Sequence, residues 1–235
     1  MPPLTRRLAT EFVGTAFLLM AIVGSGIMAE TLTTDPGLQL FENAVATAAV
    51  LAALILAFGS VSGAHFNPAV TLADRAFGGL SNRDTVGYIA AQITGAVAGV
   101  ILANLMFDLP AISLSTTARS GSNLWLAEGI ATLGLLLIIF GVVKSGRSNM
   151  AAFAVGGYIA GAVFFTSSTA FANPAVTIAR TLTDTFAGIQ PSSAPAFIIA
   201  ELLGTVVAIG LAAFLFSHIE DVADQVVVPH PGNDR

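Results

Sequence analysis

The sequence predicts an all-α membrane protein of six transmembrane helices and two re-entrant half-helices, arranged as an inverted repeat. Of the 235 residues, 55% are hydrophobic and only 10% are charged, whereas a soluble domain carries nearer a quarter charged residues. Six apolar stretches are long enough to cross a bilayer core. Outside these stretches, the phrase Asn-Pro-Ala-Val-Thr occurs at 67–71 and again at 173–177.

The apolar stretches place the spans at about 8–28, 40–60, 84–106, 124–143, 149–167 and 193–216. Turn-forming residues at 31–37 end the first span, and the run 81–84 has the composition of a helix start before the third. A longer polar loop at 107–123 separates two halves of three spans each.

The two halves share more than the repeated phrase. Glu11 in the first span matches Glu128 in the fourth, and Gln92 in the third matches Glu201 in the sixth. Because three spans is an odd number, the two copies are inverted in the membrane. We expect one membrane domain over 1–216, with repeats at about 8–106 and 124–216, followed by a polar cytoplasmic tail over 217–235.

Each copy of the repeated phrase is expected to begin a short helix. Asn is a favoured N-cap, and Pro fits the first helical position, where no amide donor is needed. At 1.5 Å per residue, helices at about 68–76 and 174–183 cross about half of a ~30 Å core. Entering from opposite sides, they bring both Asn-Pro starts to the midplane. The residues of this motif are Asn67, Pro68, Ala69, Asn173, Pro174 and Ala175.

Such a midplane selects against charge. Aligned peptide dipoles give each helix N-terminus partial positive charge, and two such ends facing one pore repel cations. Two fixed amide donors also interrupt the one-directional water chain that a proton relay needs. Neutral molecules with lone pairs are tolerated, so we predict a passive channel for small uncharged solutes.

The composition disfavours other classes of function. Cysteine is absent, and no nucleophile–base set or metal-ligand cluster is visible, so we expect no enzyme, no metal site and no cofactor. No basic patch indicates nucleic acid. No acid or His falls at the expected midplane to carry a coupling proton, which disfavours a coupled secondary transporter. The two intact motifs disfavour a purely structural junction protein.

Basic residues predict the orientation. Seven of the nine Lys and Arg residues fall on the side that holds both termini, and an excess of basic residues marks the cytoplasmic side. We expect a multi-pass protein of the inner (plasma) membrane, surrounded by lipid, with both termini in the cytoplasm. The basic residues on that side are Arg6, Arg7, Arg75, Arg83, Lys144, Arg147 and Arg235, and those on the other side are Arg119 and Arg180.

The double Asn-Pro-Ala motif, with Ser62-Gly63-Ala64-His65-Phe66 before its first copy and six spans around it, resembles the aquaporin and aquaglyceroporin family. The resemblance covers roughly residues 8–216. It implies an hourglass fold, one pore in each subunit and a homotetramer.

Several polar residues inside or beside the spans are candidates for supporting the pore. Glu11 and Glu128 are expected to accept hydrogen bonds from the backbone of the re-entrant loops, whose amides otherwise lack partners at membrane depth; the alternative is a proton relay. Gln92 and Glu201 are expected to brace the same loops. His65 either lines the cytoplasmic vestibule or braces its loop, and a role in pH gating is a further alternative.

The residue after the second motif departs from the family resemblance. Most members place an Arg there, at the outer constriction, whereas this chain has Val176. Carried over by spacing, the other constriction positions are Thr47, Gly161 and Ala170, which give a wide and weakly charged opening. Arg180 lies four residues on, and either borders the outer vestibule or pairs with Asp184. We favour the pairing.

The run from 171 to 180 and the later run from 183 to 188 resemble bacterial channels associated with arsenic-resistance operons. That resemblance implies passage of neutral metalloid hydroxides such as arsenous acid, and of methylated arsenicals. A pore without Cys has no thiolate to trap a soft As(III) centre. The alternative is a general water and glycerol facilitator without a metalloid role.

Overall fold

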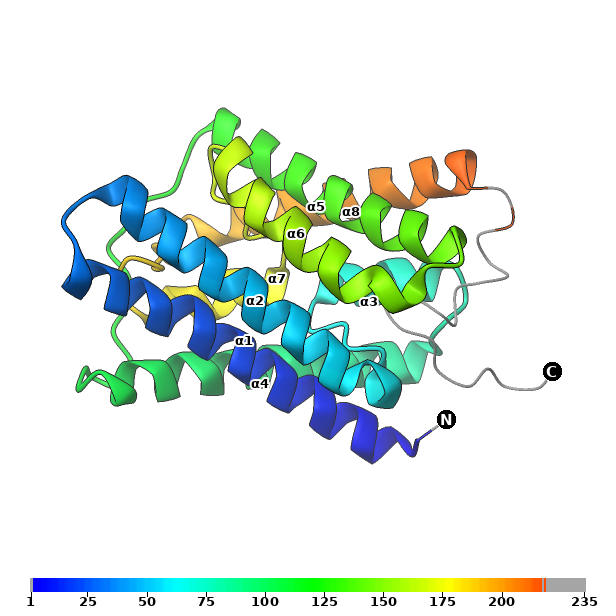
Figure 1. Cartoon of the computed structure of the whole chain (residues 1–235), viewed down its shortest axis with the longest axis horizontal. Coiled ribbons are helices and arrows are strands. Elements are labelled where there is room, and N and C mark those ends of the chain that lie inside the picture. Colours follow the sequence, from blue (N-terminus) through cyan, green and yellow to red (C-terminus); the bar gives the residue numbers. More distant parts are fainter. Residues whose placement is uncertain (1, 217, 219–235) are drawn as a thin grey trace.

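The computed structural model describes residues 2–216 and 218, and the regular elements in this part of the chain are all helical (Figure 1). In chain order they are α1 (Leu4–Leu32), α2 (Pro36–Ser62), α3 (Pro68–Ala76), α4 (Asn82–Met106), α5 (Ser122–Lys144), the 3₁₀ turn η1 (Ser148–Met150), α6 (Ala151–Phe165), α7 (Pro174–Ala179), the 3₁₀ turn η2 (Arg180–Leu182) and α8 (Ala194–Leu215).

Six of these segments are long and apolar enough to cross a membrane, which confirms the predicted spans. The first four extend beyond the hydropathy pattern at one or both ends. In α2 the extension follows from capping, because the Asp35 carboxylate accepts hydrogen bonds from the amides of Gly37 and Leu38 at 2.8 and 3.0 Å. The predicted tail lies outside the described residues, apart from His218.

Both half-helices begin at the proline of the repeated motif, as the capping argument predicts. The side-chain oxygen of Asn67 accepts a hydrogen bond from the amide of Ala69 at 2.8 Å, and that of Asn173 accepts one from Ala175 at 3.0 Å. Helix α3 has nine residues and keeps its predicted range. Helix α7 has only six, because the chain tightens into η2 at Arg180.

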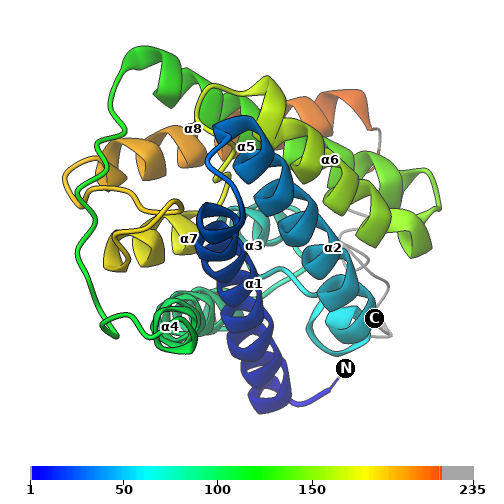
Figure 2. The ribbon, with the colours of Figure 1, turned by 60° about the vertical axis from the view of Figure 1, so that its left-hand side comes forward.

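The six long helices surround the two half-helices (Figure 2). The most extensive contacts between spans are those of α1 with α4 and of α5 with α8. These are equivalent pairs of helices in the two repeats. A glycine allows each approach. A Cβ atom on Gly95 would lie 2.3 Å from the carbonyl oxygen of Phe12, and one on Gly204 would lie 2.4 Å from that of Gly129.

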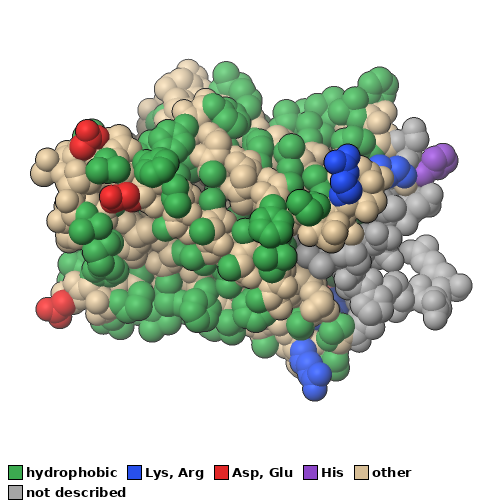
Figure 3. Space-filling model, in the orientation of Figure 1, with side chains coloured by type: hydrophobic (Ala, Val, Ile, Leu, Met, Phe, Trp, Pro, Cys, Tyr) green, Lys and Arg blue, Asp and Glu red, His purple; other side chains and the backbone are tan. Residues whose placement is uncertain are grey.

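The two ends of the bundle differ in charge. The start of α1 and the ends of α2, α5 and α8 share the end that we call the N-terminal side, and the loop 107–121 lies at the opposite end, the far side (Figure 1). On the face drawn in Figure 3, Lys and Arg side chains gather at the N-terminal side, whereas Asp and Glu gather at the far side. Between them the surface shows many exposed hydrophobic side chains, as a lipid-facing belt requires.

Candidate functional site: a pore between the half-helices

The two half-helices are joined at their N-termini by a reciprocal pair of hydrogen bonds. The Asn67 side-chain amide donates to the carbonyl oxygen of Ala172 at 2.8 Å, and the Asn173 amide donates to that of Phe66 at 2.9 Å. Each NH₂ group has a second hydrogen, and both side chains line the same cavity. The structure therefore brings the two motifs together with two amide donors beside one opening.

The loop before each motif has the same unusual backbone. Ala64 and Phe66 have φ values of 52° and 50°, and Ala170 and Ala172 have 49° and 47°. Gly63 and Thr169, which precede them, also have positive φ, so the same pattern occurs in both repeats. Left-handed backbone is rare for residues other than glycine. Such a path has no regular backbone ladder, so its amides need other acceptors.

Glu11 supplies the acceptors for the first loop. Its carboxylate accepts hydrogen bonds from the backbone amides of His65 and Phe66 at 3.0 and 2.7 Å. It also accepts from the Ser62 hydroxyl at 2.6 Å and from the Gln92 amide at 2.8 Å. The side chain is fully buried, and its position is that of a brace for the loop.

Glu128 occupies the equivalent position behind the second loop. It accepts hydrogen bonds from the amides of Phe171 and Ala172 at 3.0 and 2.8 Å. Glu201 adds a second carboxylate, which accepts from the Asn173 amide at 3.2 Å and from the Thr177 hydroxyl at 2.6 Å. The repeats differ here, because the first half uses the neutral Gln92 where the second half uses Glu201.

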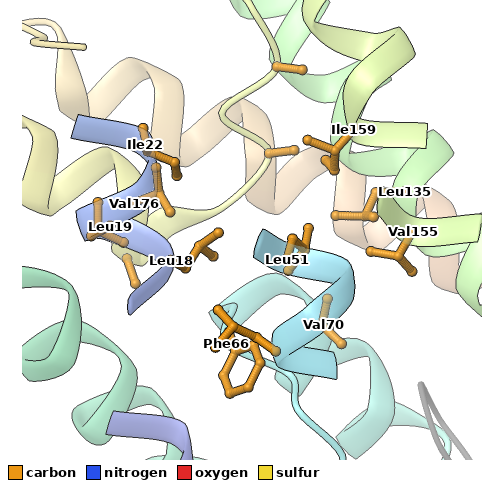
Figure 4. Packing of buried hydrophobic residues seen from close by; sticks show 14 of the residues in the cluster. Leu18, Leu19, Ile22, Leu51, Phe66, Val70, Leu135, Val155, Ile159 and Val176 are labelled. Carbon is orange, nitrogen blue, oxygen red and sulfur yellow. The ribbon is translucent and has the colours of Figure 1, made fainter. Parts of the chain in front are cut away.

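A single narrow cavity runs past both motifs. Its free volume is about 70 Å³, room for only a few water-sized molecules. Figure 4 shows Leu18, Leu51 and Leu135 turning toward one another from three different helices. The span residues that line the cavity are mostly apolar: Leu18, Ile22, Asn43, Thr47, Leu51, Ile55, Leu135, Ile139, Val155, Ile159 and Val163.

Three of the four constriction positions inferred by spacing line this cavity, namely Thr47, Ala170 and Val176. Gly161 is not among the residues that line it. It is exposed, a Cβ atom built on it would meet nothing within 4 Å, and it lies on the opposite face of α6 from Ile159 and Val163.

The segment 166–172 between α6 and the second motif is not helical, so sequence spacing from the motif does not determine the rotation of α6. The α6 residues that do line the cavity, Val155, Ile159 and Val163, are four apart and share one helix face.

The favoured pairing of Arg180 with Asp184 is wrong. Asp184 accepts hydrogen bonds from the backbone amide and the hydroxyl of Thr116 at 2.8 and 3.0 Å. The Arg180 Nε atom instead donates to the carbonyl oxygen of Ala187. Arg180 lines the cavity beside Val176, which agrees with the alternative that it borders the vestibule.

His65 combines the two roles considered for it. Its Nδ1 atom lies 3.1 Å from the Thr71 hydroxyl, and its Nε2 atom lies 4.0 Å from a carboxylate oxygen of Asp74. Both contacts tie the first loop to α3. His65 also lines the cavity, so it stands at the pore as well as within the brace.

Phe171 is a residue at the site that the sequence reasoning missed. The guanidinium carbon of Arg180 lies 3.5 Å from the centre of its ring, and that of Arg119 lies 5.3 Å away. Arg119 donates to the carbonyl oxygen of Gly188 at 2.9 Å, and burial lowers its pKa below the ordinary value. Aligning the two repeats offered a signal, since Phe171 takes the place of His65.

No group of three or more His, Cys, Asp and Glu side chains among the described residues is arranged to hold a metal ion. The carboxylates nearest the pore, Glu11, Glu128 and Glu201, are instead occupied by the loop amides described above.

Comparisons with known proteins agree with this geometry. The family model described as "Major intrinsic protein" matches residues 2–168. The chain is 47% identical over 222 residues to aquaglyceroporin AqpS of Rhizobium meliloti, which covers 94% of this chain and 95% of that protein. It is 32% identical over 165 residues to aquaporin NIP1-2 of Arabidopsis thaliana, covering 66% of this chain and 55% of that protein.

The fold is also similar to a solved structure, the X-ray structure of the aquaglyceroporin from Plasmodium falciparum. The TM-score is 0.72 at 20% sequence identity, covering 93% of this chain and 99% of that one. With the family match, the identity to AqpS and the paired half-helices in agreement, the chain belongs to the major intrinsic protein family.

Proposed function

We propose that the protein is a passive transmembrane channel for small uncharged solutes: water, polyols and metalloid hydroxides such as arsenous acid and methylated arsenicals. The observation that carries the proposal is the reciprocal bonding of Asn67 and Asn173 across one cavity. It holds two helix N-termini and two amide donors at a single level of the pore. Neither catalysis nor coupled transport needs that arrangement.

Exclusion of protons and ions follows from the same feature. The N-termini of α3 and α7 present partial positive charge to the pore from both directions, which repels cations. The Asn67 and Asn173 amides donate to solute oxygen atoms, so a water molecule that accepts from both has no lone pair left to accept from a neighbouring water, and the proton relay is interrupted there. The apolar span residues elsewhere in the cavity offer an ion no substitute for its hydration shell.

The small side chains at the constriction support passage of solutes larger than water. Thr47, Ala170 and Val176 carry small side chains, and no guanidinium is attached at position 176. Arsenous acid is uncharged at neutral pH and similar in size to a polyol. The absence of Cys from the chain removes the thiolates that would retain As(III). The extensive identity to a protein named aquaglyceroporin AqpS supports the polyol part of this proposal.

Orientation and assembly belong to the same proposal. The basic N-terminal side faces the cytoplasm of a cell whose plasma (inner) membrane holds the protein, and both termini lie there. Four copies assemble as a homotetramer in lipid, each with its own pore, as the family resemblance implies.

The test is a stopped-flow comparison of water, glycerol, urea and arsenite flux in proteoliposomes of the full chain. We expect all four to move down their gradients without a proton or sodium gradient. Accumulation that depends on such a gradient would overturn the channel assignment. Fast water and glycerol flux with no arsenite flux would instead establish the alternative, a general water and glycerol facilitator.

Val176→Arg tests the constriction in the same assay. The long side chain enters the cavity next to Arg180, so flux of glycerol and arsenite should fall more than flux of water. Val176→Leu is the matched control, since it adds one methylene group without the charge or the length of Arg. Equal loss of water and glycerol flux in Val176→Arg would contradict the assignment of this position as a size filter.

A further inference from the structure

Among the described residues that line the cavity, Arg180 is the one that carries a guanidinium. It begins η2, directly after α7, four residues beyond Val176. Four residues correspond to about one helical turn, or roughly 5 Å along the axis. Its side chain is therefore on the far side of the position where the family usually places an Arg.

The guanidinium is held rigidly. The Nε atom donates to the carbonyl oxygen of Ala187, and the group stacks on the Phe171 ring with its central carbon 3.5 Å from the ring centre. Phe171 itself packs edge to face against Phe197, with ring centres 5.3 Å apart. Stacking on an aromatic face suits the planar guanidinium better than it suits an ammonium group.

The outer half of the same guanidinium is available to a solute. Across the described residues, no hydrogen bond reaches either terminal nitrogen of Arg180, and no carboxylate oxygen lies within 4.0 Å of it to form an ion pair. The terminal nitrogens are also absent from the buried polar atoms that lack a partner. This positive charge has no ion-pair partner within that distance and faces a narrow cavity, so its electric field acts on each solute that enters.

We propose that Arg180 is the cation filter of the far-side mouth, taking over from a neighbouring position the charge that Val176 lacks. The inference rests on the proposed channel function and extends it. Displacing the guanidinium by one turn leaves only small side chains at Thr47, Ala170 and Val176, while a fixed positive charge still faces solutes at the entrance. Its terminal N–H groups also donate to the oxygen atoms of arriving neutral hydroxyl and urea-type solutes.

The test compares urea with guanidinium, which have the same planar shape and differ in charge. Both fluxes are measured in proteoliposomes holding the full-length protein. We expect the wild type to pass urea and exclude guanidinium. Arg180→Gln should raise the ratio of guanidinium to urea permeability by at least about tenfold, the change produced by lowering a barrier by ~1.4 kcal/mol.

Two further variants separate charge from packing. Arg180→Lys retains the charge and should retain exclusion, even though it loses the stacked plane. In the double variant Val176→Arg with Arg180→Gln, a guanidinium one turn deeper should restore exclusion. Arg119→Gln is the matched control, since Arg119 also stacks near Phe171 but is not among the cavity residues; its ratio should equal that of the wild type.

The outcomes are distinct. An unchanged ratio in Arg180→Gln, with urea flux present, overturns the assignment of Arg180 while the channel function stands. An equal rise of the guanidinium-to-urea ratio in Arg119→Gln also overturns the assignment of Arg180, because the exclusion would then depend on the overall charge of the far-side mouth. Absence of urea, glycerol and water flux from the wild type would instead reject the proposed function.

Discussion

Replacing Glu11 by Ala removes the acceptors that hold the first pore loop. Two backbone amides, those of His65 and Phe66, donate to this carboxylate at 3.0 and 2.7 Å. Both amides lie in left-handed or adjoining backbone that leaves them no other acceptor in the described part of the chain. A buried donor that loses its partner costs about 1–3 kcal/mol, so the two together cost about 2–6 kcal/mol. The Ser62 hydroxyl and Gln92 amide can reorient, and are not counted.

That loss is a large fraction of the roughly 5–15 kcal/mol that stabilises a folded domain. The free energy of unfolding is measured on detergent-solubilised protein by denaturant titration, alongside water permeability. Glu11→Gln keeps one acceptor oxygen and should fall between Glu11→Ala and the wild type. Because the same hydrogen bonds hold the conformation of the pore loop, water flux should fall in the same order as the free energy of unfolding.

Glu42→Ala is the matched control, since Glu42 is a half-buried carboxylate in α2 whose Oε2 atom has no hydrogen-bond partner among the described residues. Its free energy of unfolding should not fall. If the free energies of unfolding of Glu11→Ala and Glu42→Ala differ by less than about 0.5 kcal/mol, a range ordinary for surface substitutions, the reasoning about loop bracing is refuted.

Three other predictions concern single positions. Glu201→Gln should keep or raise the free energy of unfolding, because Gln retains the acceptor oxygen, leaves one buried carboxyl group in place of two neighbouring ones and matches the first repeat; a loss above about 1 kcal/mol in denaturant titration would contradict this. Gly204→Ala should cost about 1–3 kcal/mol by overpacking, measured the same way, whereas Gly210→Ala, with nothing within 4 Å of its Cβ, should cost nothing. Val163→Phe should reduce glycerol flux in proteoliposomes severalfold, whereas Gly161→Phe, on the outer face of α6, should leave it within about twofold; the reverse order would restore the assignment made by spacing.

Local chemistry made much of this fold predictable. The start of α3 at Pro68 follows from an Asn cap and a Pro at the first helical position, which act within three residues of sequence. The six spans follow from hydropathy, since each must satisfy its backbone within itself. The placement of Glu11 and Glu128 behind the loops follows from their matching positions in the two repeats.

Sequence spacing is least informative where the chain is not helical. The segment 166–172 separates α6 from the second motif, and the second short helix was expected to continue to about 183, so that Asp184 would lie one turn from Arg180. The chain turns into η2 at Arg180 instead, and Asp184 bonds Thr116, 68 residues earlier in the chain. Contacts between distant segments and the rotation of a helix after a loop depend on tertiary packing, which local patterns do not contain.

The reciprocal bonds of Asn67 and Asn173 also have a consequence for how the chain can vary. Each repeat donates its pore amide to a carbonyl of the other, so neither half contains a complete filter. A substitution in one filter loop changes the geometry of an amide encoded more than a hundred residues away. The two halves therefore form one filter, and the effect of a substitution in one filter loop depends on the residues of the other loop.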